Sequence, residues 1–241
     1  MLLKYISCEQ KKFLYQKWNT IVMICIIVFV PIMVLSLDSF AGEEGYLLCK
    51  SKLLQGFYLS QAGYVVLSAL YFGQEYQKST LRTSLLSTPN RFLFLLAKDC
   101  CILMWTIILL VMTTTFSIVI LHIAFDVDLS IENLIDLLKT LLPAYGSILE
   151  LVLLTSGIVV VTRSMIVSMA IMVSLILGLG NLLLQYGTVM RYLPVISMMN
   201  GFLVEDLPWY PATWEGLVVQ GIWCVALLFA EVMLFQRRYV R

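Results

Sequence analysis

Residues 101–125 read CILMWTIILLVMTTTFSIVILHIAF, a run that contains no Asp, Glu, Lys or Arg. A helix needs about 20 mostly apolar residues to cross roughly 30 Å of hydrocarbon, so this run predicts a membrane-spanning helix. The whole chain agrees, because 61% of its 241 residues are hydrophobic and only 13% are charged. An average soluble domain is about half apolar and about a quarter charged. The sequence therefore predicts a protein whose main solvent is lipid.

Six runs of this kind follow one another along the chain. The predicted spans are 19–37, 53–73, 101–125, 140–162, 164–186 and 216–235. Only Arg163 separates the fourth span from the fifth, so one long broken helix there is the alternative and would reduce the count. We predict an all-α membrane protein, residues 1–241 forming a single transmembrane domain with six transmembrane helices.

The distribution of Lys and Arg predicts the orientation, because cytoplasmic loops carry an excess of these residues. Four cations fall on one side of the predicted membrane, namely Lys50, Lys52, Lys139 and Arg191. The others fall on the opposite side, at Lys4, Lys11, Lys12, Lys17, Lys78, Arg82, Arg91, Lys98, Arg163, Arg237, Arg238 and Arg241. Both termini are therefore predicted to be cytoplasmic (N-in/C-in).

Two segments outside the spans also carry a pattern. Residues 1–18 place apolar side chains at helical spacing between lysines, which predicts an N-terminal amphipathic interface helix on the inner membrane surface; a solvated helical arm is the alternative. Residues 187–215 are too apolar for a free outer loop and contain breaks at Pro194, Gly201 and Pro208. We predict an outer re-entrant segment there, with a surface-lying loop as the alternative.

The predicted cytoplasmic loop 74–98 contains a short helix signal. Thr80 or Ser79 is a suitable N-cap, and Leu81 and Leu85 share one helical face. Pro89 ends the helix, because proline has no backbone N–H to donate. The segment predicts a short amphipathic helix on the cytoplasmic face.

This loop resembles the type-2 ABC exporter permeases. In that family a glutamate leaves the second span and is followed by a Gly-Thr-Leu-type start, a short helix, a proline, a Ser/Asn-Arg pair and a lysine. The matching positions here are Glu75, Ser79-Thr80-Leu81, Leu85-Leu86, Pro89, Asn90-Arg91 and Lys98. Ser79 stands where the family has glycine.

The resemblance implies that the short helix is a coupling helix seated in a separate ATPase subunit. Its implied contact residues are Glu75, Thr80, Leu81, Arg82, Leu85, Pro89 and Arg91. For the cations Arg82 and Arg91, anchoring at anionic lipid headgroups is the alternative. The implied assembly has two ATPase subunits, which bind ATP and Mg, and a second permease subunit that is identical or homologous. The implied cargo is amphipathic or hydrophobic, such as a drug or an antimicrobial peptide, as in the lantibiotic or bacteriocin-immunity branch of bacterial cell membranes.

Polar residues inside the spans are further candidates, because ionisable groups in hydrocarbon are costly. Glu150 lies near the middle of the fourth span, at the substrate path or a helix interface, with a packing role as the alternative. Asn181 and Gln185 lie one turn apart in the fifth span and are expected to bond to another helix. Glu231 in the sixth span is a weaker candidate.

The sequence lacks the residues that several classes of function require. There is no GxxxxGK[ST] phosphate loop, so we expect no cofactor in this chain and no ATP site of its own. His122 is the single histidine, and no catalytic or metal site is expected. Scattered cations and a net charge of +1 argue against nucleic acid as a partner. The alternative to an exporter subunit is a non-transporting membrane protein, either a stand-alone immunity factor or a scaffold.

Overall fold

The computed structural model describes residues 2–36, 46–76, 90–125 and 130–237, and the regular elements in these ranges are all helical. The longer elements are α1 (Leu2–Tyr15), α2 (Lys17–Ser36), α3 (Tyr46–Gly73), α5 (Arg91–Phe125), α6 (Ile131–Thr162), α7 (Met165–Ser174) and α9 (Thr213–Arg237). The shorter ones are η1 (Gln74–Tyr76), η2 (Leu175–Leu179), α8 (Gly180–Leu183), η3 (Leu184–Tyr186), η4 (Thr188–Tyr192) and η5 (Ile196–Phe202). Within these ranges, six helical stretches are long and apolar enough to cross a membrane, which confirms the predicted number of spans.

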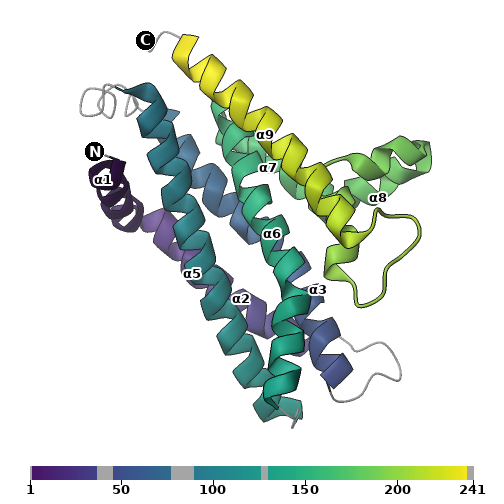
Figure 1. Ribbon diagram of the computed structural model, residues 1–241. Coiled ribbons are helices and arrows are strands. Elements are labelled where there is room, and N and C mark those ends of the chain that lie inside the picture. Colours follow the sequence, from purple (N-terminus) through teal and green to yellow (C-terminus); the bar gives the residue numbers. More distant parts are fainter. Residues whose placement is uncertain (1, 37–45, 77–89, 126–129, 238–241) are drawn as a thin grey trace.

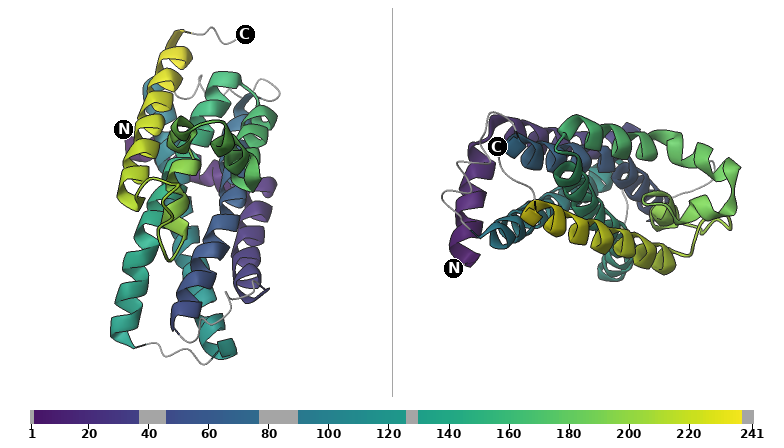
Figure 2. Two further views of the ribbon diagram at one scale, coloured as in Figure 1. Left: turned by 90° about the vertical axis from the view of Figure 1, so that its right-hand side faces the viewer. Right: turned by 90° about the horizontal axis from the view of Figure 1, so that it is seen from above.

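The spanning helices form an elongated bundle with α3 and α6 at its centre (Figure 1). α6 packs against α3 and α9, and α3 also packs against α2 and α7. Seen from above, α1 lies across one edge of the bundle and the broken fifth span lies at the opposite edge (Figure 2). α1, the start of α5 and the end of α9 share one end of the bundle, as the prediction of two termini on one side requires.

Five helices begin before the predicted spans, α2 and α9 by less than a turn and three others by about two turns or more. α3 begins at Tyr46, α5 at Arg91 and α6 at Ile131, whereas the spans were predicted from residues 53, 101 and 140. The extra turns carry charged and polar side chains, which end an apolar run without ending a helix. At α6 the true start is fixed by an N-cap, because the Ser130 side chain accepts a hydrogen bond from the backbone N–H of Asn133.

The fourth and fifth spans are joined by a tight reversal. Arg163 ends α6 in the left-handed conformation, with φ 56°, and its N–H donates to the carbonyl of Val159. The side chain of Ser164 then caps α7 by accepting from the N–H of Val167. Two separate helices result, so the alternative of one long broken helix is wrong.

The fifth span, predicted as one helix over 164–186, is interrupted by the π-helical turn η2. Gly178 within that turn has φ 131°, a conformation that glycine adopts without a Cβ clash. The hydroxyl of Tyr58 on α3 donates to the carbonyl of Ile176 at 2.7 Å. The irregular backbone is therefore held by a hydrogen bond from a neighbouring helix, as is needed where lipid supplies none.

The connection from the fifth span to α9 is packed against protein. Ile196, Ser197, Met198 and Asn200 of η5 are buried, and η5 packs on α9 and α6. Gly216 of α9 allows the closest approach, because a Cβ there would overlap the carbonyl of Ser197. The re-entrant position of this connection in the membrane stays a prediction.

Candidate functional site

The predicted coupling residues divide into two groups. Thr80, Leu81, Arg82, Leu85 and Pro89 lie outside the described residues. Glu75 and Arg91 are described and stand on either side of that segment, Glu75 in η1 directly after α3 and Arg91 at the start of α5. The structure therefore shows how the two flanks of the coupling segment are held.

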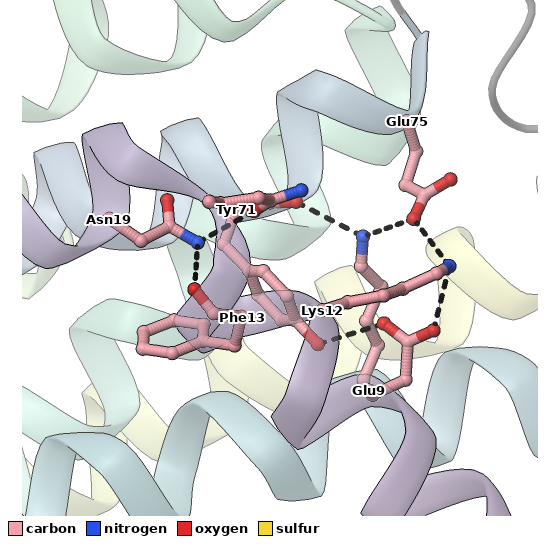
Figure 3. Close-up of polar contacts among 8 residues, drawn as sticks. Glu9, Lys12, Phe13, Asn19, Tyr71 and Glu75 are labelled. Atoms are coloured by element: carbon pink, nitrogen blue, oxygen red, sulfur yellow. Dashed lines mark hydrogen bonds and ion pairs between the residues drawn. The ribbon is translucent and has the colours of Figure 1, made fainter.

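Glu75 is buried at the end of the bundle that carries α1, with only 7% of its surface exposed. Its Oε1 lies 3.2 Å from Nζ of Lys98 on α5 and 3.3 Å from Nζ of Lys12 on α1 (Figure 3). One carboxylate thus links three helices through two ion pairs.

The network extends from Glu75 to a second carboxylate. Lys12 also lies 3.0 Å from Oε1 of Glu9, and the hydroxyl of Tyr71 donates to Oε2 of Glu9 at 3.0 Å (Figure 3). Lys98 donates to the backbone carbonyl of Tyr71 at 3.0 Å. We call Glu9, Lys12, Tyr71, Glu75 and Lys98 the junction cluster. It holds two carboxylates and two ammonium groups, so its charges balance.

Lys12 shows how the junction cluster compensates for burial. Burial alone would lower the pKa of Lys12, but the nearby carboxylates of Glu9 and Glu75 outweigh it, and the pKa is raised above its ordinary value. The ammonium form is therefore favoured at neutral pH.

Aromatic rings enclose the cationic side of the junction cluster. Nζ of Lys98 lies 4.4 Å from the ring centroid of Tyr71 and 5.1 Å from that of Phe72. Phe13 of α1 stacks on Trp105 at 5.4 Å and meets the edge of Tyr71 at 5.0 Å. The amphipathic pattern of α1 thus buries an aromatic anchor as well as its charges, and α1 is fastened to α3 and α5.

Arg91 holds the other flank of the coupling segment. Its guanidinium donates to the carbonyls of Phe235 and Gln236, each at 3.1 Å. These carbonyls belong to the last turns of α9, where a cation is favoured by the helix dipole. The side chain of Asn90 caps the start of α5 by accepting from the N–H of Leu93. The start of α5 is therefore tied to the end of α9.

Glu150 lies on α6 and faces α9. A Cβ at Gly221 would lie 3.2 Å from its Oε1, so the absence of a side chain at Gly221 makes room for the carboxyl group. Its Oε2 is buried and has no hydrogen-bond partner among the described residues. This position fits the helix-interface reading.

Asn181 and Gln185 line a different region, a cavity of about 460 Å³ beside the broken fifth span. We call it the flank cavity, and its lining residues are Asn181, Leu184, Gln185, Thr188, Arg191, Pro208, Trp209 and Tyr210. The hydroxyl of Tyr210 donates to Oδ1 of Asn181 at 3.1 Å. The structure thus brings Asn181 and Gln185 together, and the lining does not include Glu150.

Sequence reasoning missed most of the junction cluster. Glu9 is the single acidic residue of α1, and its spacing of three from Lys12 was the available signal for a pair. The contacts of Lys12 and Lys98 with Glu75 join distant parts of the chain and leave no local pattern.

Two more acids beside this cluster were not recognised as its neighbours, half-buried Asp99 and buried Glu231. Asp99, next to Lys98, accepts a hydrogen bond from the hydroxyl of Ser156 on α6 at 3.3 Å. Glu231 of α9 is 1% exposed, and neither of its carboxylate oxygens has a hydrogen-bond partner among the described residues. No group of three or more His, Cys, Asp or Glu side chains in the described ranges could hold a metal ion.

Comparison with known protein families gives a match. The family described as ABC-2 family transporter protein matches residues 5–181, which is more than half of the chain and runs from within α1 to within α8. No curated protein and no solved structure matches the chain.

Proposed function

The chain belongs to the ABC-2 family of transporter proteins, and on that premise we propose that it is an exporter subunit driven by a separate ABC ATPase. Membership makes it a multi-pass membrane component of an ABC transporter and not itself a catalytic unit. The cargo we propose is amphipathic or hydrophobic, and the favoured cargo is an antimicrobial peptide whose removal gives self-immunity to a bacterium.

The observation that supports coupling to an ATPase is the anchoring of both flanks of residues 77–89. Glu75 connects one flank to α1 and α5 through ion pairs. Arg91 connects the other flank to α9 through two hydrogen bonds. A force on the segment between them would therefore reach three helices.

The mechanism we propose uses these anchors. Closure of the ATPase around ATP and Mg displaces residues 77–89, where the coupling helix is expected at Thr80, Leu81, Arg82 and Leu85. The displacement moves α1, α5 and α9 together, because their ends are tied at the same level of the bundle. In packed proteins such small shifts are amplified into rigid-body changes between discrete states. A pathway between two permease subunits, identical or homologous, then opens to the outside, with both termini cytoplasmic.

Co-purification with the candidate ATPase in mild detergent tests the proposal. Leu81→Asp and Arg82→Glu are expected to release the ATPase while the permease stays folded. The matched control is Lys139→Glu. It reverses the charge of an exposed cation near the start of α6, at the end of the bundle away from α1 (Figure 1). Thermal unfolding of each variant checks that the fold is intact.

The outcomes separate the two candidate functions. Release by both coupling variants, with binding retained in Lys139→Glu, supports the exporter subunit. If no ATPase binds the wild type, or the coupling variants leave both binding and stimulated ATP turnover unchanged, the non-transporting scaffold becomes the better reading.

A further inference from the structure

The flank cavity has the size and lining of a ligand site. Its volume of about 460 Å³ lies within the range of small-molecule pockets, roughly 300–1,000 Å³. Among the described residues that line it, Arg191 is charged and none is acidic. Since a guanidinium stays protonated in proteins, the cavity carries a fixed positive charge.

Arg191 has donors to spare. One terminal nitrogen, Nη2, donates to the hydroxyl of Tyr192 at 2.6 Å, and the guanidinium lies 4.8 Å from the centre of that ring. Its Nε is buried and has no hydrogen-bond partner among the described residues. A buried donor without a partner is unfavourable, which indicates that a further group completes this site.

The two amide side chains of the cavity also keep unused donors. Oδ1 of Asn181 accepts from Tyr210, and within the described ranges the amide nitrogen of Asn181 has no acceptor. The side chain of Gln185 makes no hydrogen bond to any described residue. A guanidinium with neutral amide donors beside it suits a phosphodiester, whose oxygens accept several hydrogen bonds and match the planar guanidinium fork.

The surface around the cavity resembles a membrane interface. Trp209, which lines the cavity, is exposed by 69%, and Tyr186, next to Gln185 in the chain, is exposed by 83%; such rings are enriched where hydrocarbon meets headgroups. Leu177 and Leu182, on the same broken span, are exposed by 69% and 56%. A polar cavity with an exposed apolar surface next to it fits a molecule that has an anionic head and hydrocarbon chains.

We infer that the flank cavity binds the phosphodiester headgroup of an anionic phospholipid, with the acyl chains along the exposed apolar surface of η2 and α8. Arg191 takes the phosphate, and the amides of Asn181 and Gln185 donate to the remaining headgroup oxygens. This site is independent of ATPase coupling and of the cargo.

Native mass spectrometry of the delipidated full chain tests the inference. The protein is titrated with phosphatidylglycerol and, separately, with phosphatidylcholine that has the same acyl chains. Wild type is compared with Arg191→Gln and with the matched control Lys139→Gln. Millimolar inorganic phosphate is added as a competitor, which separates a lipid site from a site for free phosphate.

We expect wild type to bind phosphatidylglycerol about tenfold more tightly than phosphatidylcholine, because the choline cation beside the phosphate opposes the attraction between that phosphate and the Arg191 guanidinium. Arg191→Gln should lower the affinity for phosphatidylglycerol about tenfold. The affinity for phosphatidylcholine, which carries the same phosphodiester, should fall by a smaller factor, so the preference for phosphatidylglycerol should shrink. Lys139→Gln should match wild type, and phosphate should not displace the lipid.

Three results would overturn the inference: equal affinity for the two lipids, unchanged phosphatidylglycerol binding in Arg191→Gln, or full displacement by phosphate. Thermal unfolding in phosphatidylcholine checks the fold of each variant. If Arg191→Gln does not fold, the double variant of the exposed amides, Asn181→Ala with Gln185→Ala, replaces it. It should reduce phosphatidylglycerol binding several-fold, and wild-type binding in that variant would equally refute the site.

Discussion

In the junction cluster, every charged side chain has a neighbour of opposite sign. Lys12 and Lys98 contact Glu75, and Lys12 also contacts Glu9. In the flank cavity, by contrast, Arg191 has no carboxylate within ion-pair distance among the described residues. The difference separates two roles of a charged side chain. A charge that stabilises the fold is neutralised by partners inside the protein. A charge that binds a ligand keeps hydrogen-bond donors available for a group from outside.

The largest effect is expected when one charge of the junction cluster is removed. Glu75→Gln leaves the Lys98 ammonium, whose side chain is 2% exposed, without its ion-pair partner. Breaking a buried pair from one side costs about 3–5 kcal/mol, so we expect a large fall in the unfolding midpoint of the purified protein. The double variant Glu75→Leu with Lys98→Met removes both charges and should recover most of the loss. Equal destabilisation in the single and double variants would contradict this account.

A smaller effect is expected in the segment that shapes the flank cavity. The buried amide of Asn200 donates to the carbonyls of Leu207 and Pro211 and accepts from the N–H of Leu207. Asn200→Ala leaves these backbone groups unpaired, which costs about 2–3 kcal/mol. Thermal unfolding should show the loss, and binding of phosphatidylglycerol should weaken while co-purification of the ATPase stays at the wild-type level. Loss of the ATPase in this variant would show that the two regions are not independent.

Arg91→Met tests whether the contact between Arg91 and α9 is needed for coupling. The variant removes two hydrogen bonds to α9 at a partly exposed site, so the expected cost is about 1 kcal/mol. Co-purification of the ATPase should persist, whereas cargo-stimulated ATP turnover should fall because the start of α5 is no longer tied to α9. Unchanged stimulated turnover would remove Arg91 from the proposed transmission.

The smallest effect concerns Lys12 and pH. A raised pKa means that the contribution of Lys12 to stability is fully present below its unfolded pKa, about 10.4, and is lost as pH rises through the higher folded value. The difference in unfolding midpoint between wild type and Lys12→Met should therefore be constant from about pH 6 to 9 and shrink only in more alkaline buffer. If the difference in unfolding midpoint already shrinks between about pH 6 and 9, another group controls the docking of α1.

The number of spans was predictable because each apolar run is long enough to cross a bilayer. Their limits were not, and α5 shows why. The predicted span was started after Lys98 and Asp99, because charged residues usually face water. In the structure Lys98 forms an ion pair with Glu75, and Asp99 accepts a hydrogen bond from Ser156. The break at Gly178 was equally hidden, because the hydrogen bond that supports it comes from Tyr58, distant in sequence.

The candidate residues show the same limit. Glu75 and Arg91 were selected through a local pattern, and their partners on α1, α5 and α9 come from parts of the chain that this pattern does not cover. Asn181 and Gln185 were expected to bond to another helix. The cavity they share with Arg191 depends on a connection whose path the sequence does not specify.

The fastening of α1 has a consequence for biosynthesis. Glu9 and Lys12 leave the ribosome first, but their partners Tyr71, Glu75 and Lys98 follow only with α3 and α5. We therefore expect α1 to stay undocked at the membrane surface, with its charges hydrated, until the third span has been inserted. Stalled nascent chains that end before Arg91 should leave α1 open to protease, whereas chains extended past Phe125 should protect it. α1 is then synthesised before the helices that hold it and is fixed in place only after them.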